Sequence, residues 1–204
     1  MLTTPQGWWM DDAGTVKTDK VPIRETWEVL EELVDSGLTR SIGISNTQAQ
    51  LLYDIQSYAR HPISSLQIEH HPYLVQPDLI QMARENGIAV TGYTSFGPAS
   101  FLELSGAFRE RAKDAGLLFD APVVKQAAER LKVTPAQVLL RWATQRGIAV
   151  IPKSNHVERL KQNLAVTSFD LSQDELKGIS ALDRGLRFND PGFYLPNHPI
   201  RIFA

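Results

Sequence analysis

Strand-like and helix-like segments alternate along most of this 204-residue chain, and this alternation limits the fold more than any other feature. Apolar residues at helical spacing predict helices, and the short apolar runs between them predict strands. The helices expected in the first half span Thr26–Val34, Leu51–Ala59 and Leu79–Ala83, and the strands span Ser41–Asn46, Ser65–His70 and Ile88–Thr94. Strands separated by helices pair in parallel and are covered by those helices, so the chain is expected to be an α/β protein.

The second half keeps this alternation after one interruption. Residues 99–121 break it, and a stretch of this length at the carboxyl end of a strand is usually a functional lid or a disordered loop. Helices are then expected at Pro122–Leu131, Thr134–Gln145, Val157–Leu164 and Ser172–Leu182, with a fourth strand at Ile148–Ile151. A Pro- and Asn-rich tail without periodicity begins at Gly185. Residues 1–204 are expected to form one domain without a linker.

The number of strands indicates an incomplete architecture. Eight βα units close a barrel, and four do not. A lone four-stranded parallel sheet has two unpaired edges, which favour association with another chain. We therefore expect half of a larger fold, with self-association through its exposed strand edges.

Composition excludes several classes of protein. The net charge of −2 argues against a nucleic-acid or anionic-membrane surface, and the basic cluster Arg109–Lys113 is diluted by acidic residues and predicts a solvated helix face. The chain has no cysteine, which removes disulfides, thiolate metal sites and thiol catalysis. No apolar run is long enough to span a membrane, and residues 1–12 do not resemble a signal peptide. A cytoplasmic location is expected.

A polar turn follows the fourth strand. The turn Pro152–Asn155 is expected at the carboxyl end of that strand, which is the edge where such folds bind ligands. Lys153, the Ser154 hydroxyl and the free N–H groups of the next helix are suited to bind phosphate, although an ordinary solvated lysine fits the same spacing. The helix adds three residues suited to anion and amide contacts, Arg159, Gln162 and Asn163.

Polar or aromatic residues also end the first and third strands. Ser45 and Asn46 are suited to hydrogen-bond a ligand, but a cap on the next helix is the favoured interpretation of Asn46. Tyr93 either stacks on a planar ligand ring or packs in the core. Glu103, just past the following turn, either accepts from ribose hydroxyls or is a surface carboxylate.

The second strand carries an unusual number of polar residues. Gln67, Glu69 and His71 share one face by the period of two. Gln67 is a stronger candidate for a functional role than either histidine, because a polar group inside a small barrel is costly unless it is paired. His70 and His71 point to opposite faces and no third ligand is placed by the sequence, so no metal site is expected.

The sequence by itself does not specify a complete catalytic site. Three histidines lie in loops or at helix starts, His61, His156 and His198. No acidic partner is expected beside any of them, and no nucleophile–base pair stands out.

Four motifs in this order closely resemble the C-terminal half of the aldo-keto reductase family: Ser41–Asn46 (SIGISN), Leu66–Tyr73 (LQIEHHPY), Tyr93–Pro98 (YTSFGP) and Ile151–Asn155 (IPKSN). Residues 134–155 and 185–191 are similar to fungal NAD(P)H-dependent xylose reductases. The resemblance covers essentially the whole chain. It implies the (β/α)8 TIM-barrel fold, of which this chain supplies the last four βα units and the C-terminal substrate loop.

The resemblance also implies a site for NADPH, with NADH as an alternative. The nicotinamide carboxamide contacts match Ser45, Asn46 and Gln67, and the aromatic stacked on the nicotinamide ring matches Tyr93. The loop over the pyrophosphate matches Ser95, Phe96, Pro98 and Ser100, and a ribose carboxylate associated with use of NAD as well as NADP matches Glu103. The 2′-phosphate contacts match Lys153, Ser154, Asn155 and Arg159, and the adenine contacts match Gln162 and Asn163.

The implied substrate is a small aldehyde or sugar such as D-xylose, reduced to the alditol by hydride transfer. Asn189 matches a substrate-loop residue that reaches the sugar. The family's catalytic Asp, Tyr, Lys and His come from the first four strands, which have no counterpart here, so no catalytic residue is assigned. We expect a truncated chain that is weakly active or inactive alone. The alternative is a non-catalytic nucleotide-binding or assembly half-barrel.

Two positions depart from the family pattern. Thr47 stands where phenylalanine is common, and Gly92 stands where alanine is usual. Both changes are expected to loosen packing, and a glycine inside a strand weakens that strand.

Overall fold

The computed structural model describes residues 19–104, 106–194 and 201–203. Its internal contacts divide the chain into two compact units, residues 1–64 with 190–204, and residues 65–189. The expectations for residues 1–12 and for His198 concern positions outside the described residues. The expectation of one domain over residues 1–204 stays a prediction.

The first unit contains the elements α1 (Ile23–Asp35), β1 (Gly43–Ser45), α2 (Ala49–Gln56) and α9 (Pro191–Tyr194). The apolar face predicted for the first helix is confirmed only in part in α1: Trp27 is buried, but Leu33 is exposed. Leu52 and Ile55 form the buried face of α2. Gly37 ends the first helix with a φ of 72°, a conformation that glycine adopts without strain.

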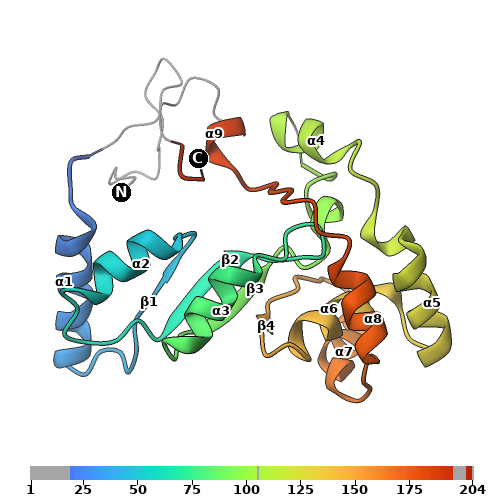
Figure 1. The fold of residues 1–204 in the computed structure, drawn as a ribbon, viewed down its shortest axis with the longest axis horizontal. Coiled ribbons are helices and arrows are strands. Elements are labelled where there is room, and N and C mark those ends of the chain that lie inside the picture. Colours follow the sequence, from blue (N-terminus) through green and yellow to red (C-terminus); the bar gives the residue numbers. More distant parts are fainter. Residues whose placement is uncertain (1–18, 105, 195–200, 204) are drawn as a thin grey trace. The chain divides into compact units, whose positions relative to one another are not determined.

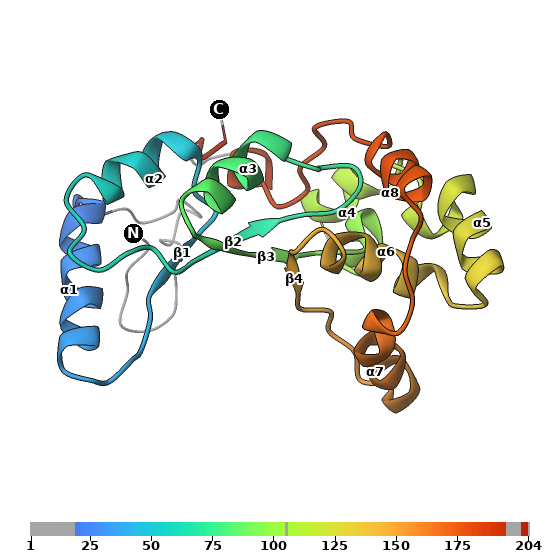
Figure 2. The ribbon, with the colours of Figure 1, turned by 60° about the horizontal axis from the view of Figure 1, so that its bottom comes forward.

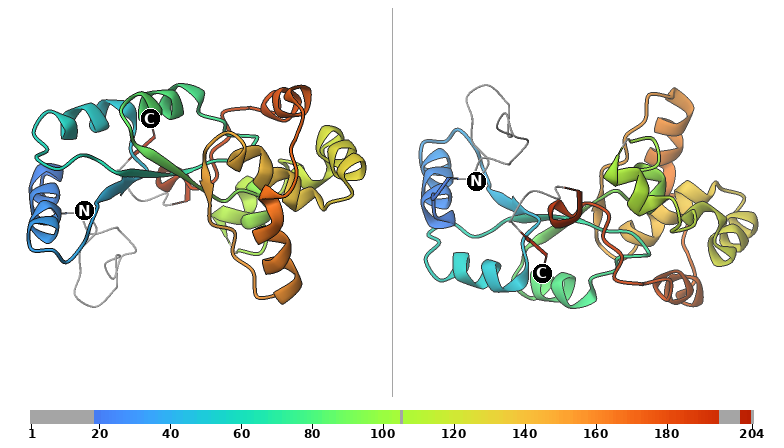
Figure 3. Two further views of the ribbon diagram at one scale, coloured as in Figure 1. Left: turned by 90° about the horizontal axis from the view of Figure 1, so that it is seen from below. Right: turned by 90° about the horizontal axis from the view of Figure 1, so that it is seen from above.

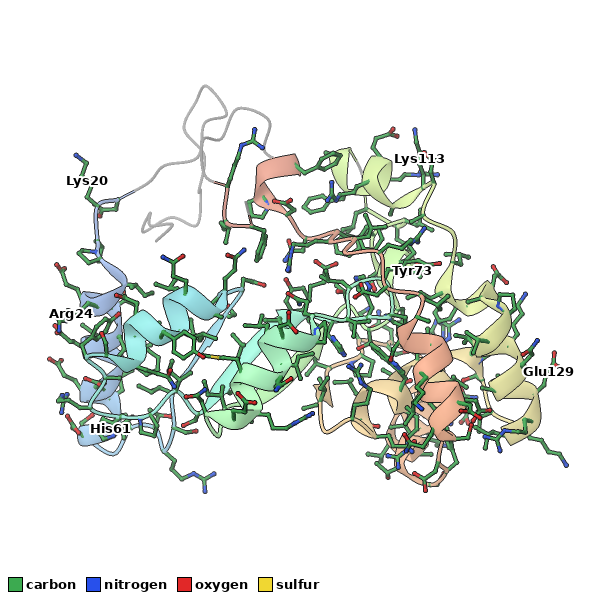
Figure 4. All side chains as sticks on the ribbon, in the orientation of Figure 1. Lys20, Arg24, His61, Tyr73, Lys113 and Glu129 are labelled. Carbon is green, nitrogen blue, oxygen red and sulfur yellow. The ribbon has the colours of Figure 1, made fainter. Side chains whose placement is uncertain are left out.

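A buried carboxylate of α1 contacts the segment that follows α2. Glu31 is 1% exposed and accepts hydrogen bonds from the backbone N–H groups of Arg60 (2.5 Å) and His61 (2.9 Å). Burial by itself raises the pKa of Glu31, but these two N–H groups and the Arg60 guanidinium outweigh it and lower the pKa below its ordinary value. Figure 4 shows His61 at the end of α1 opposite Arg24.

The expectation that His61 has no acidic partner is wrong. Its Nε2 atom lies 2.7 Å from Oδ1 of Asp35, on the last turn of α1. The two residues are 26 positions apart, so only the folded chain brings them together.

The second unit contains a parallel sheet of β2 (Ser65–Glu69), β3 (Ala89–Tyr93) and β4 (Ala149–Val150). Gln67 pairs with Thr91 across β2 and β3, and Gly92 pairs with Val150 across β3 and β4. Helix α3 (Pro77–Glu85) packs against β3, as Figure 3 shows. The predicted α/β class with parallel strands is confirmed, and closure into half a barrel stays a prediction.

The helices of the second half lie close to their predicted positions: α5 (Pro122–Leu131), α6 (Pro135–Thr144), α7 (Val157–Leu164) and α8 (Gln173–Ser180). Helices α5, α6 and α8 pack together, and α7 lies against α6 (Figure 2). Capping boxes begin α6 at Thr134 and α8 at Ser172. The buried Trp142 donates from Nε1 to the Ser180 hydroxyl at 3.0 Å, which joins α6 to α8.

The stretch expected to be a lid or a loop contains three short helices: η1 (Gly97–Ser100), α4 (Ala107–Ala112) and η2 (Leu118–Asp120). It also contributes to the core, because Phe101 is 5% exposed and Leu118 is fully buried. On α4, Arg109 is exposed as predicted, whereas Arg111 is half-buried and donates to the carbonyl of Arg187. The buried aromatic and aliphatic residues explain why this stretch packs as structure and not as an open loop.

The predicted loosening at Gly92 is wrong. A Cβ atom at this position would lie 3.0 Å from Cβ of His70, so the neighbouring side chain already fills the space. The His70 ring stacks on Trp142 with a centroid separation of 4.8 Å. Burial, with the charges of Arg146 and His71, lowers the pKa of His70 to about 3.

The loosening expected at Thr47 stays a prediction. Its side chain is buried, and its hydroxyl donates to the backbone carbonyl of Ser45 at 3.0 Å. The threonine hydroxyl therefore has a hydrogen-bond partner close in the sequence.

Among the described helices, none has the length and apolar content needed to cross a membrane.

Candidate functional site

The candidate site of the second unit lies where β2, β3 and β4 end. Parallel strands place their carboxyl ends along one edge, so the segments after Glu69, Tyr93 and Val150 are neighbours there. Thr94 follows β3 with a φ of 53°, and its hydroxyl donates to the carbonyl of Tyr93 at 2.8 Å. Left-handed backbone at a residue other than glycine is strained and is concentrated at functional sites.

Two residues expected in this site are brought together. The side chain of Tyr93 is half-buried, and its hydroxyl accepts a hydrogen bond from Nδ2 of Asn189 at 2.8 Å. Gln67 has an exposed side chain on β2, so it does not occupy a sealed core as its strand position predicted. Its polar group needs no internal partner while it remains accessible to water.

The loop after β3 has an unsatisfied buried hydroxyl. Ser95 is 6% exposed, and its Oγ atom has no hydrogen-bond partner among the described residues. Phe96 packs on Phe119 with a ring separation of 5.4 Å. The remaining predicted loop residues are the buried Pro98, the half-buried Ser100 and the exposed Glu103. A buried hydroxyl without a partner is costly, and a bound ligand atom would satisfy it.

The turn before α7 presents cations that the protein does not neutralise. Lys153 and Arg159 are exposed, and in the described part of the chain neither has a carboxylate within ion-pair distance. Glu158, on the same helix, pairs with Lys161 at 2.9 Å instead. The other predicted residues of this patch are Asn155 and Gln162, which are exposed, and Ser154 and Asn163, which are half-buried. The arrangement is suited to bind an anion.

Ser154 also has a local structural role. Its hydroxyl accepts from the backbone N–H of His156 at 3.1 Å. His156 is the residue that precedes the first turn of α7. The turn is therefore held in shape by its own serine, which leaves the Lys153 side chain free to extend into solvent.

The first unit contains the other two predicted residues, Ser45 and Asn46. Ser45 ends β1 and is exposed. The favoured interpretation of Asn46 as a helix cap is wrong, because Gln48 occupies the N-cap position of α2 and makes no side-chain cap. Asn46 instead has a φ of 55°, a left-handed conformation that asparagine tolerates better than most residues.

Sequence reasoning missed a residue that links this edge of the sheet to the segment before α9, Glu69. It is fully buried, and its carboxylate accepts from the backbone N–H groups of Phe188 and Asn189, each at 2.8 Å. Its Oε1 atom also lies 2.9 Å from Nε2 of His71. The signal in the sequence was a carboxylate inside a predicted strand, on the same face as a histidine two positions later.

The segment Asp183–Asn189, which includes the start of the tail predicted from Gly185 onward, is fixed by hydrogen bonds to the loop after β2. The backbone N–H of Leu186 donates to the carbonyl of Tyr73 at 2.9 Å, and Nη2 of Arg187 donates to the Gln76 side chain at 2.8 Å. Figure 1 shows this segment leaving α8 and passing that loop, and Figure 4 labels Tyr73 there.

The hollows of the second unit lie elsewhere. One of about 240 Å³ is lined by Gly87, Ala89 and Gly147 at the amino ends of β3 and β4. Another of about 530 Å³ is lined by Arg84 and Arg146 among others. Neither of these two hollows is lined by a predicted site residue. The described residues include no cluster of three or more His, Asp or Glu side chains that would hold a metal ion.

Comparisons with known proteins agree on one family. The model of the aldo/keto reductase family matches residues 10–184. A probable NAD(P)H-dependent D-xylose reductase of Emericella nidulans is 59% identical over 98% of this chain and 60% of its own length. The NAD(P)H-dependent D-xylose reductase of Pyricularia oryzae is 50% identical over 98% of this chain and 61% of its own length.

A solved structure gives the same result. The aldose reductase of Schistosoma japonicum is 34% identical, with a TM-score of 0.74 over 86% of this chain and 52% of that chain. The chain thus spans about 60% of the length of the curated relatives quoted above.

Proposed function

The chain belongs to the aldo/keto reductase family, and from this premise we propose that it forms the cofactor-binding and substrate-loop part of an NAD(P)H-dependent reductase of sugar aldehydes. D-Xylose is the substrate suggested by the names of the relatives, which describe D-xylose reductases. The contact that best supports the proposal is the hydrogen bond of Asn189 to Tyr93, because it joins the proposed substrate residue to the proposed nicotinamide-stacking ring.

The residues present fit a dinucleotide phosphate. The Ser95 hydroxyl is buried without a partner at the strand end, and Lys153 and Arg159 are exposed cations without carboxylate partners in the described residues. We assign Ser95, Phe96, Pro98 and Ser100 to the pyrophosphate. Lys153, Ser154, Asn155 and Arg159 are assigned to the 2′-phosphate, Gln162 and Asn163 to adenine, and Glu103 to ribose.

The remaining assignments concern the nicotinamide end. Ser45, Asn46 and Gln67 would hold the carboxamide, and the Tyr93 ring would stack on the nicotinamide. When bound, the cofactor supplies the hydride. Tyr93 and Asn189 orient the reactants and exclude water from one side of the ring, which lowers the barrier by holding a reactive geometry.

No residue of this chain is assigned as the acid that protonates the carbonyl oxygen. Missing general-acid catalysis typically costs about 10²–10⁴-fold in rate. We therefore expect the chain to bind NADPH and to show little or no xylose reduction alone.

A second candidate function is an assembly module. Helix α7 has no buried residue, and Val157, Leu160 and Leu164 on it are 65%, 46% and 85% exposed. Apolar residues of a helix normally pack against another element. This surface favours a chain that acts after association with further protein, through this face or an exposed strand edge.

The test is a fluorescence titration of the purified chain with NADPH, with size-exclusion chromatography on the same sample. Lys153→Ala and Arg159→Ala are each expected to weaken binding by about tenfold, because each removes a charge-assisted hydrogen bond to phosphate. Lys161→Ala is the matched control on the same helix and should leave affinity unchanged. Absence of saturable binding would exclude a cofactor site in this chain.

Consumption of NADPH in the presence of D-xylose separates the two candidate functions. Saturable binding without turnover, in a monomeric sample, supports a cofactor-binding part of a larger reductase. Turnover by the chain alone would show that it contains its own acid and would contradict the assignment made above.

A further inference from the structure

Glu69 has no assigned role in the proposed reaction, although its contacts meet both Tyr93 and Asn189. We propose that Glu69 is a positioning residue, which holds Asn189 against the hydroxyl of Tyr93 and so fixes the substrate loop to the nicotinamide-stacking ring. This inference rests on the proposed function for the roles of Tyr93 and Asn189. It concerns how their geometry is maintained.

The contacts form a closed circuit. Oε2 of Glu69 accepts from the backbone N–H of Asn189 at 2.8 Å. Nδ2 of the same asparagine donates to the Tyr93 hydroxyl at 2.8 Å. Tyr93 is in turn the strand partner of Glu69 between β2 and β3, and its carbonyl accepts from the N–H of His70 at 3.1 Å. A displacement of any member therefore disturbs the other two.

Because Glu69 is buried, its carboxylate depends on these hydrogen bonds. A carboxylate with no exposed surface must have its oxygens satisfied, since an unpaired buried charge is strongly destabilising. Glu69 meets this need with the N–H groups of two consecutive residues, Phe188 and Asn189, and with Nε2 of His71. Two successive N–H groups that face one carboxylate fix the backbone direction there, and the direction of the Asn189 side chain follows.

The neighbouring aromatic ring supports the same geometry. Phe188 packs on both Phe101 and His71, each with a ring separation of 5.4 Å. The same imidazole lies 2.9 Å from Oε1 of Glu69 through its Nε2 atom. Phe188 is thus held from both its backbone and its ring, which leaves Asn189 to face Tyr93.

If Glu69 had only a structural role, it would attach the segment 183–189 to the rest of the second unit. Other contacts already do this, because Asp183 accepts from the N–H of Val75 at 3.3 Å and the N–H of Leu186 donates to Tyr73 at 2.9 Å. Glu69 adds contacts only at the end of the segment, at the two residues nearest Tyr93. This placement favours a positioning role over general attachment.

Glu69→Gln is the direct test on the full 204-residue chain. The amide has one acceptor oxygen, and its NH₂ group faces a donor in either orientation, so one of the two backbone N–H groups loses its acceptor. The control is Glu31→Gln, at a buried carboxylate in the first unit whose Oε1 atom accepts both N–H groups of two consecutive residues, so that an amide oxygen in that place keeps both hydrogen bonds.

Amide hydrogen exchange is the first measurement. Glu69→Gln is expected to speed exchange by at least about tenfold at Phe188 or at Asn189, whichever N–H loses its acceptor, which corresponds to the loss of one hydrogen bond to a charged group. Glu31→Gln should leave exchange at 188 and 189 unchanged, because both N–H groups that Glu31 holds donate to its Oε1 atom and lie in the other unit. Unchanged exchange at 188 and 189 in Glu69→Gln would overturn the proposal.

A double-mutant cycle with Tyr93→Phe separates positioning from attachment. In the wild-type and Glu31→Gln backgrounds, Tyr93→Phe should lower the folding equilibrium constant by about fivefold, the effect of one hydrogen bond. In the Glu69→Gln background it should have almost no effect, because Asn189 no longer meets the hydroxyl. A full effect in all three backgrounds would overturn the positioning role.

NADPH titration connects the result to the proposed function. Glu69→Gln is expected to weaken NADPH binding by a few-fold while Glu31→Gln does not, because only Glu69 orients the ring on which the nicotinamide stacks. Equal weakening by both variants would contradict the positioning role. If the wild-type chain binds no NADPH, the proposed function fails, and the folding cycle alone decides whether Glu69 positions Asn189.

Discussion

Each of the two units contains one glutamate that is almost completely buried and accepts two consecutive backbone N–H groups. Glu31 does this for Arg60 and His61, 29 and 30 residues away, and Glu69 does it for Phe188 and Asn189, 119 and 120 residues away. The two side chains are 1% and 0% exposed. The same local chemistry therefore connects segments at very different separations along the chain.

The partners differ in a way that matters. Glu31 also meets the Arg60 guanidinium at 3.1 Å, and the side chain of that arginine is 57% exposed. Among the described residues, the side-chain partner of Glu69 is the fully buried His71. One side-chain partner is therefore exposed to solvent and the other is not. The comparison indicates that the first carboxylate serves stability and the second also serves geometry.

The largest expected difference comes from removing each carboxylate. Glu69→Ala should lower the free energy of unfolding by about 4 kcal/mol, since two buried N–H groups and an imidazole lose their acceptor. Glu31→Ala should cost about 2 kcal/mol, because its partners regain water more easily. Urea unfolding of both variants measures this, and a larger loss for Glu31→Ala would reverse the comparison.

The pH dependence of the free energy of unfolding tests whether His70 is buried in its neutral form. The folded pKa of His70 is about 3 against an ordinary 6.5, so the unfolded chain binds the proton first as pH falls. The free energy of unfolding is therefore highest above pH 6.5, the ordinary pKa of histidine, and decreases as the pH falls toward the folded pKa. The expected decrease is about 2 kcal/mol between pH 6.5 and about pH 5. His70→Phe keeps a ring on Trp142 and should remove this loss. An identical pH profile for wild type and variant would contradict it.

A third prediction concerns packing beside the same histidine. Gly92→Ala should destabilise the chain by about 1 kcal/mol, since the new Cβ would meet His70 at 3.0 Å. The control is Gly106→Ala, where no atom lies within 4 Å of the added Cβ and the positive φ gives only backbone strain. Thermal unfolding at one pH measures both, and stabilisation by Gly92→Ala would show that the strand has room there.

The smallest expected effect is at the surface of the first unit. Arg60→Met removes the guanidinium but keeps the backbone N–H that donates to Glu31, so the loss of stability should be small compared with that of Glu31→Ala. The loss should shrink further at high salt, because the arginine is more than half exposed. A loss as large as that of Glu31→Ala would mean that the ion pair, and not the two N–H groups, holds this carboxylate.

Much of the fold was predictable because it depends on local signals. The bounds of α5 and α7 match the predicted ranges, and the capping box at Ser172 was visible as a serine followed by a glutamate three positions later. The turn with Lys153 was recognisable for the same reason. These features involve residues only a few positions apart.

The missed features have a common cause. The pairing of His61 with Asp35 joins residues 26 positions apart, and the true conformation of Asn46 depends on where α2 begins. Close packing at Gly92 depends on a ring from the neighbouring strand. No local pattern encodes such contacts, because each partner is chosen by the packing of a distant segment.

The sequence by itself determined the α/β alternation, the family resemblance and the identity of the proposed cofactor residues, since periodicity, caps and motifs are short-range properties. Only the tertiary structure decided which buried polar groups meet. Glu69 gave little signal as a strand residue, and the 183–189 segment had no periodicity at all. Their contact follows from a physical requirement that arises only on folding, because a carboxylate removed from water needs hydrogen-bond donors. The folded chain provides them as the N–H groups of Phe188 and Asn189.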